Sequence, residues 1–151
     1  MYDILKYAYM PNTFEEAVNI LKTCNNKEEC VEKAYELVTR KYRGYRIKTY
    51  TNLFSIFLND IEKLWRRTGF MHCTQINSVI EQLLIASGHF TNGDIRKRWT
   101  QIWLFSPHQF LQIQINNNKW INVDAWSHPF GISLGDYAHG FHSGHIKGEK
   151  L

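Results

Sequence analysis

The spacing of apolar residues changes once along this chain, near Lys97. Before that point apolar residues recur at intervals of three and four, the period of an amphipathic helix. After it, residues 109–115 (QFLQIQI) alternate strictly, and residues 99–105 and 119–126 are rich in aromatic and β-branched side chains, as strands are. Helices followed by an antiparallel β-sheet define the α+β class, so this is the expected fold class.

Four helices are expected in the first part of the chain, from capping residues and apolar spacing. The first two should form a hairpin. The fourth starts at or just after a cysteine, so this thiol is expected at a helix N-terminus. The helices run from Thr13 to about Cys24, from Asn26 to the basic segment at Arg40, from Leu53 to a C-cap at Gly69, and from Cys73 to Gly88.

The last two strands are expected to form a β-hairpin, because residues 116–118 are all asparagine, which tolerates the left-handed conformations of a tight turn. With a three-residue loop, Phe110 stands opposite Asp124. His108 is then the diagonal neighbour of Asp124 on the same face of the hairpin. Diagonal neighbours lie roughly 7 to 8 Å apart at the backbone, so an Asp side chain can reach a histidine ring.

The composition fits one globular domain over residues 1–151, with 44% hydrophobic residues and no repeats or linker. Its parts are a helical region at about 1–90, a β-sheet region at about 95–130 and a polar, His- and Gly-rich tail at 131–151. No apolar stretch approaches the roughly 18 to 20 residues of a membrane span, and the N-terminus lacks the features of a secretion signal. Three cysteines do not suit a disulfide scaffold, so a cytoplasmic protein without membrane contact is expected.

The positive charge of the chain is concentrated at residues 40–48 (RKYRGYRIK), which hold five basic side chains, although the net charge of the whole chain is +4. Tyrosines alternate with these cations, a pattern that can bind nucleic acid or an acidic protein. A solvated loop after a helix is the favoured interpretation. The candidate partner-binding residues are Lys41, Arg43, Arg46 and Lys48.

Cys73, His108 and Asp124 are the candidate catalytic residues. A cysteine attacks as the thiolate, and a helix N-terminus and a nearby imidazolium lower the pKa of such a thiol from about 8.5. A histidine base and a carboxylate that orients it would complete a triad. The alternative is an inert cysteine in a turn, a strand-edge histidine and a turn aspartate.

The spacing of these residues resembles the transglutaminase-like superfamily over roughly residues 60–126. In its signature a catalytic His is followed by an aromatic residue, a polar residue, a turn, a Trp and a Val-Asp pair; its nucleophile Cys opens an apolar helix that ends at a Gly. The matching positions are His108, Phe110, Gln112, Trp120, Val123, Asp124, Cys73 and Gly88, with Ile95 and Arg96 where the family often has a small apolar-Arg pair. The departures are Phe110 for Trp, Gln112 for Glu, Ala125 and Trp126 for Pro-Thr, and His72 directly before the cysteine.

The resemblance implies a papain-like core in which the nucleophile helix packs on the sheet that bears His and Asp. It implies attack of Cys73 on a peptide or protein amide, a thioester, and release by water or by an amine. No cofactor is expected. The backbone N–H of Cys73 would donate one oxyanion hydrogen bond, and Trp65, Tyr50 or Gln101 the other. The small size favours a protease or amidase over a cross-linking enzyme.

Two rival functions remain open. One is an arylamine-type acyltransferase that uses the same triad with a thioester donor. The other is a catalytically silent binding module in which the basic segment engages nucleic acid or an acidic protein. The tail histidines could hold a metal, but glycines interrupt them and no metal site is expected; they are His128, His139, His142 and His145.

Overall fold

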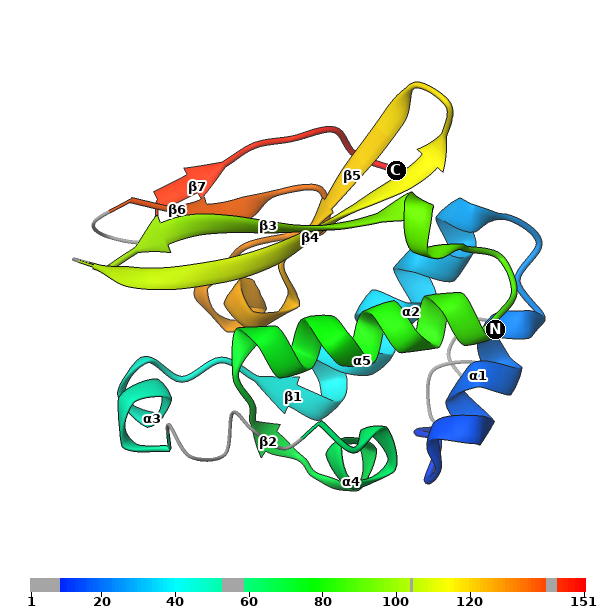
Figure 1. Cartoon of the computed structure of the whole chain (residues 1–151), viewed down its shortest axis with the longest axis horizontal. Coiled ribbons are helices and arrows are strands. Elements are labelled where there is room, and N and C mark those ends of the chain that lie inside the picture. The colour runs from blue at the N-terminus through cyan, green and yellow to red at the C-terminus, as the bar shows by residue number, and fades with distance from the viewer. Residues whose placement is uncertain (1–8, 53–58, 104, 141–143) are drawn as a thin grey trace, which may run out of the picture.

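The computed structural model describes residues 9–52, 59–103, 105–140 and 144–151 (Figure 1). It is a mixed helix and strand fold with antiparallel sheets, so the α+β class is confirmed in this general form. Its helices are α1 (Phe14–Lys22), α2 (Lys27–Lys41), α3 (Arg46–Thr51), α4 (Ile61–Arg66) and α5 (Cys73–Ala86), with 3₁₀ turns η3 (Asn92–Asp94) and η4 (Ala125–Phe130). Its strands are β1 (Tyr42–Arg43), β2 (Gly69–Phe70), β3 (Ile95–Ile102), β4 (Ser106–Asn116), β5 (Lys119–Val123), β6 (Tyr137–His139) and β7 (Gly144–Ile146).

The first two helices begin where the sequence predicts. The Thr13 hydroxyl accepts a hydrogen bond from the backbone of Glu16 at 3.1 Å, and the Asn26 side chain accepts one from Glu29 at 2.8 Å. Such caps contribute about 1 kcal/mol each, because they satisfy N–H groups that have no acceptor inside the helix. Both helices pack against α5 and against each other.

Helix α5 is central to the molecule and runs beneath the main sheet (Figure 1). It contacts α1, α2 and α4 as well as β4, and Ile76, Ile80 and Leu83 on its apolar face are almost fully buried. His72 is its N-cap residue, and the Nε2 atom of His72 lies 2.9 Å from the carbonyl oxygen of Asn52. Cys73 is therefore the first residue of a helix that packs against other helices and against the sheet.

The main sheet has the order β3-β4-β5, and both strand pairs are antiparallel. Leu111 pairs with Val123, which is the register that the sequence predicts for the hairpin. The loop is shorter than expected, because β4 extends to Asn116, which pairs with Lys119 after a shift in register. The irregularity is confined to the turn, so the strand ends that carry the candidate site keep the expected pairing.

The first strand of the sheet lies earlier than predicted, since β3 begins at Ile95 and ends at Ile102. The strand cannot continue because Trp103 has a φ of 45°, a left-handed conformation that a residue with a Cβ adopts at a cost. The Trp103 carbonyl instead accepts a hydrogen bond from the backbone of Ser106, which starts β4.

Two other predictions need correction. The first six residues of the predicted third helix, residues 53–58, lie outside the described residues, and α4 ends at Arg66 and not at Gly69. Gly69, with a φ of 83°, instead starts β2, which pairs in parallel with β1. The basic segment is not a simple loop, since it supplies β1 and the start of α3.

The predicted polar tail is part of the fold. Strands β6 and β7 form a hairpin, and single bridges join Gly140 to Ile102 and Gly135 to Asn122. Ile132 and Ala138 are buried in the core. Within the described ranges no helix is long and apolar enough to cross a membrane.

Gly44 permits a close contact between the β1–α3 loop and η4. A Cβ at this position would lie 2.2 Å from the carbonyl oxygen of Trp126, whereas at Gly93 the nearest heavy atom would be 3.7 Å away. We expect Gly44→Ala to lower the free energy of unfolding by about 1 to 3 kcal/mol, the cost of overpacking. Gly93→Ala is the matched control and should change it by less than about 0.5 kcal/mol in urea titrations. Equal stabilities of the two variants would contradict the close contact.

Candidate active site

The centre of the candidate site is a buried pair formed by His108 and Asp124. The Nε2 atom of His108 lies 2.9 Å from each carboxylate oxygen of Asp124, and both side chains are almost fully buried. His108 comes from β4, and Asp124 directly follows β5 as the N-cap of η4. The hairpin thus brings together the two residues that its register predicts, over 16 positions of the chain.

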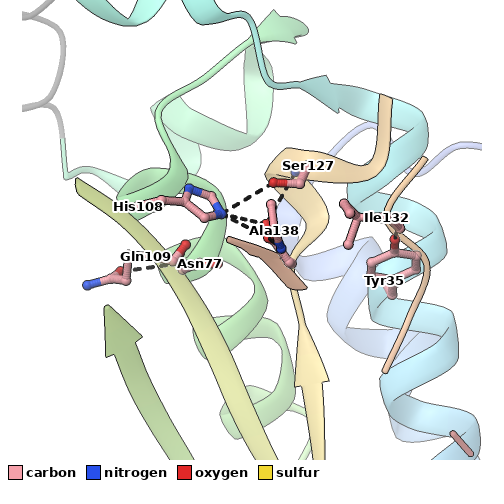
Figure 2. Close-up of polar contacts among 8 residues, drawn as sticks. Tyr35, Asn77, His108, Gln109, Ser127, Ile132 and Ala138 are labelled. Carbon is pink, nitrogen blue, oxygen red and sulfur yellow. Dashed lines mark hydrogen bonds and ion pairs between the residues drawn. The ribbon is translucent and has the colours of Figure 1, made fainter. Parts of the chain in front are cut away.

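Backbone groups fix the carboxylate of Asp124 in place. Its two oxygens accept hydrogen bonds from the backbone N–H of Ala138 at 2.9 Å and of Ser127 at 3.3 Å. The Ser127 hydroxyl also lies 3.3 Å from Nε2 of His108 (Figure 2). These contacts hold one edge of the imidazole, so the other ring nitrogen, Nδ1, faces away from Asp124 and is available for chemistry.

The environment of His108 favours its protonated form. Burial lowers the pKa of His108, but the charge of Asp124 and its hydrogen bond raise it, and a hydrogen bond with Cys73 adds to the rise. The pKa reaches about 10, from an ordinary value of 6.5. The imidazolium is therefore stabilised between a carboxylate on one side and the thiol on the other.

Cys73 and His108 line one pocket, so the structure brings all three predicted catalytic residues together. Cys73 is half-buried at the start of α5, whereas His108 is covered by the ring of Trp126 at a centroid distance of 5.2 Å. The indole Nε1 of Trp126 is buried and has no hydrogen-bond partner among the described residues. The rest of the pocket is lined by Arg46, Thr49, Tyr50, Ile102, Trp103, Ser106, Pro107 and Trp126.

A second buried contact fixes α5 against β4 beside the site. The side-chain amide of Asn77 donates to the carbonyl oxygen of Gln109 at 2.8 Å and also lies 3.3 Å from its side-chain oxygen (Figure 2). Asn77 is one helical turn after Cys73, and Gln109 is next to His108. The contact therefore sets the distance between the two elements that carry the thiol and the imidazole.

Sequence reasoning missed Asn77, Ser127 and Ala138 as parts of the site. Asn77 had a usable signal, because it is a polar residue on the apolar face of a predicted helix and needs a buried partner. Ser127 lies three residues after Asp124, the spacing of a side-chain cap. Ala138 acts through its backbone, which no side-chain pattern reveals.

The three oxyanion candidates lie in different places. Trp65 is fully buried in the helical core, where its indole N–H donates to the carbonyl of Pro11 at 3.3 Å, so it does not reach the pocket. Gln101 is exposed on β3 and is not among the residues that line the pocket. Tyr50 lines the pocket and is half-exposed.

The four basic candidate residues also lie in different places. Lys41 lies over the ring of Trp65 at 5.0 Å, and Lys48 lies over Tyr45 at 5.2 Å. Arg43 lines a neighbouring hollow. Arg46 alone of the four also lines the pocket of Cys73.

The tail histidines that the structure describes contact separate partners. His128 lies 3.1 Å from the hydroxyl of Tyr35, His139 contacts Thr100, and His145 pairs with Asp136. His142 lies outside the described residues. Within the described ranges no three potential metal ligands form a group.

Comparisons of the chain with protein-family models, with curated proteins and with solved structures find no match. The candidate function therefore depends on the residues themselves, through the motif spacing in the sequence and the geometry around Cys73.

We expect Cys73 to be the most reactive of the three thiols. It is half-buried and next to an imidazolium, whereas burial raises the pKa of Cys30 to about 12 and Cys24 is also buried. Iodoacetamide at about pH 6 should alkylate Cys73 first, because the thiolate is the reactive form. Peptide mapping by mass spectrometry measures the order, and labelling of Cys24 or Cys30 at the same rate would contradict a special environment at Cys73.

The raised pKa of His108 also predicts how stability depends on pH. Because the folded value of about 10 exceeds 6.5, the stabilisation from the charged ring is fully present below about pH 6.5 and is lost as the pH rises to about 10. The difference in free energy of unfolding between the native protein and His108→Gln should therefore shrink from pH 6 to pH 10. Urea titrations at pH 6, 8 and 10 test this, and a constant difference would show that Asp124 does not hold the ring in its charged form.

Proposed function

We propose that this protein is a thiol enzyme that cleaves amide bonds through a thioester on Cys73, as the resemblance to transglutaminase-like proteins implies. The observation that carries the proposal is the pair of His108 and Asp124 next to Cys73, with the imidazole oriented by both carboxylate oxygens. A buried, positioned His-Asp pair beside a thiol at a helix N-terminus is the arrangement that thiol nucleophiles require.

In the first half of the reaction the Cys73 thiolate attacks the amide carbonyl. The C–S bond forms, the C–N bond breaks, and the His108 imidazolium gives its proton to the leaving amine. In the second half His108 takes a proton from water, the resulting hydroxide attacks the thioester, and the C–S bond breaks. The products are an amine and a carboxylic acid, which gives its proton to the solvent, and the site returns to the Cys73 thiolate and the His108 imidazolium.

Three groups near Cys73 are suited to stabilise the oxyanion. The backbone N–H of Cys73 has no acceptor within α5, because it belongs to the first turn of the helix. The side chains of Tyr50 and Trp126 both line the pocket, and the indole N–H of Trp126 has no hydrogen-bond partner among the residues that the structure describes. We propose one of these two as the second donor.

We propose an amidase or protease, in which water is the acceptor of the acyl group. The pocket formed by described residues around Cys73 has a volume of about 20 Å³, and about 10 to 15 Å³ is needed for one water molecule. A water can therefore lie beside the thioester.

The triad is tested with glutamine-containing and ordinary peptides as acyl donors. Cys73→Ala should abolish acyl-enzyme formation and turnover without unfolding the protein, and His108→Ala should be nearly as severe. Asp124→Asn should lower the rate by about 10² to 10⁴, because the base loses its orientation. Intact-mass spectrometry detects the acyl-enzyme, and peptide cleavage is measured by chromatography.

Cys24→Ala is the matched control, because it removes a buried thiol that does not line the pocket. Its turnover should equal that of the native protein. If Cys73→Ala retains full turnover, the thioester mechanism is wrong.

A further inference from the structure

Arg46 occupies an unusual place at the edge of the candidate active site. Its guanidinium lies 5.3 Å from the ring centre of Trp103 and 4.7 Å from that of Phe130. The same side chain lines the pocket of Cys73 and a neighbouring open hollow of about 590 Å³. Two aromatic faces therefore hold a cation at the boundary between the nucleophile and the hollow.

The polar groups of Arg46 are incompletely satisfied. Its Nε atom is buried and has no hydrogen-bond partner among the described residues. None of the described residues that line the two pockets is an aspartate or a glutamate. A buried donor without an acceptor is destabilising, so a ligand that supplies an acceptor there would gain binding energy.

The surface beside Arg46 has the same sign of charge. Arg43 lines the open hollow, and Lys48 lies on the same short helix as Arg46. Lys48 also lines a third hollow with Arg66 and Arg67, where no described lining residue is a carboxylate. Charges of one sign around a site raise the local concentration of ligands of opposite charge. The substrate that suits this face is therefore anionic.

The form of the anion follows from the guanidinium and its surroundings. An arginine presents a planar fork of N–H donors that matches a carboxylate with two parallel hydrogen bonds. The faces of Trp103 and Phe130 that Arg46 covers are not free to stack on nucleic-acid bases. Apart from Arg43, the remaining walls of the hollow, which include Tyr45, Ile47 and Pro129, suit an apolar side chain.

We propose that Arg46 is a specificity-determining residue that binds a carboxylate of the acyl donor, so that the preferred substrate is an acidic peptide with an apolar residue close by. This inference rests on the proposed function, since it concerns the substrate of the same site. It goes beyond the triad because it assigns Arg46 a contact with the substrate and no part in bond cleavage.

The test compares two peptides that differ only in charge, acetyl-Leu-Glu-Gln-Gly-Leu-amide and acetyl-Leu-Gln-Gln-Gly-Leu-amide. Binding to the Cys73→Ala protein is measured by calorimetry, so the result does not depend on turnover. The acidic peptide should bind about 10- to 100-fold more tightly, the range of a charged hydrogen-bonded contact. Arg46→Met should remove this preference, and Arg46→Lys should restore only part of it, because lysine keeps the charge and loses the fork.

Arg96→Met is the matched control, because Arg96 also lies on an aromatic ring, that of Trp120 at 3.9 Å, but does not line either pocket. It should keep the full preference. Equal binding of the two peptides, or a preference that survives Arg46→Met, would overturn the proposal. The proposal would also be overturned if a single-stranded oligonucleotide bound more tightly than the acidic peptide and lost its affinity for the Arg46→Met protein. The site would then bind nucleic acid.

The same peptides given to the native protein separate the two proposals. Cleavage of both peptides at equal rates would reject the role of Arg46 and leave the thiol mechanism in place. Charge-selective binding that depends on Arg46, without any acyl-enzyme on Cys73, would reject the thiol mechanism and keep the carboxylate site.

Discussion

The carboxylate of Asp124 is the group on which the rest of this site depends. A buried carboxylate is costly unless hydrogen bonds satisfy it, and here the acceptable partners come from separate parts of the chain. His108 belongs to β4, Ser127 to η4 and Ala138 to β6. The hydrogen bonds to this one carboxylate therefore connect the hairpin, the turn that follows it and the C-terminal strands. The orientation of His108 depends on all three of these elements.

The sequence was sufficient to predict those features that depend on interactions between residues close together in the chain. Thr13 and Asn26 mark helix starts because a cap needs only a backbone N–H three residues away. The pairing of Leu111 with Val123 follows from the alternation of the strands and the asparagine turn between them. The meeting of His108 and Asp124 was predictable for the same reason, since both residues lie on one hairpin.

The sequence was insufficient to predict contacts in which the partner of a side chain is distant in the chain or is a backbone group. The indole N–H of Trp65 could serve an oxyanion by its chemistry alone, but it donates to the carbonyl of Pro11, which lies 54 positions earlier. Residues 131–151 have the composition of a polar tail, because the core residues Ile132 and Ala138 are isolated in the sequence and the strands are too short to show an apolar period. The two-residue strand at Tyr42 is likewise too short for a pattern, and its parallel partner at Gly69 lies far along the chain.

The exposed position of α3 has a consequence for how this protein can vary. No residue of α3 is buried, although Arg46, Thr49 and Tyr50 of this helix line the Cys73 pocket. Cys73 and His108 belong instead to α5 and β4, which pack against each other. Substitutions on α3 can therefore alter what approaches the thiol while the geometry of the thiol and imidazole stays the same, so this short helix is the natural place for related proteins or designed variants to diverge.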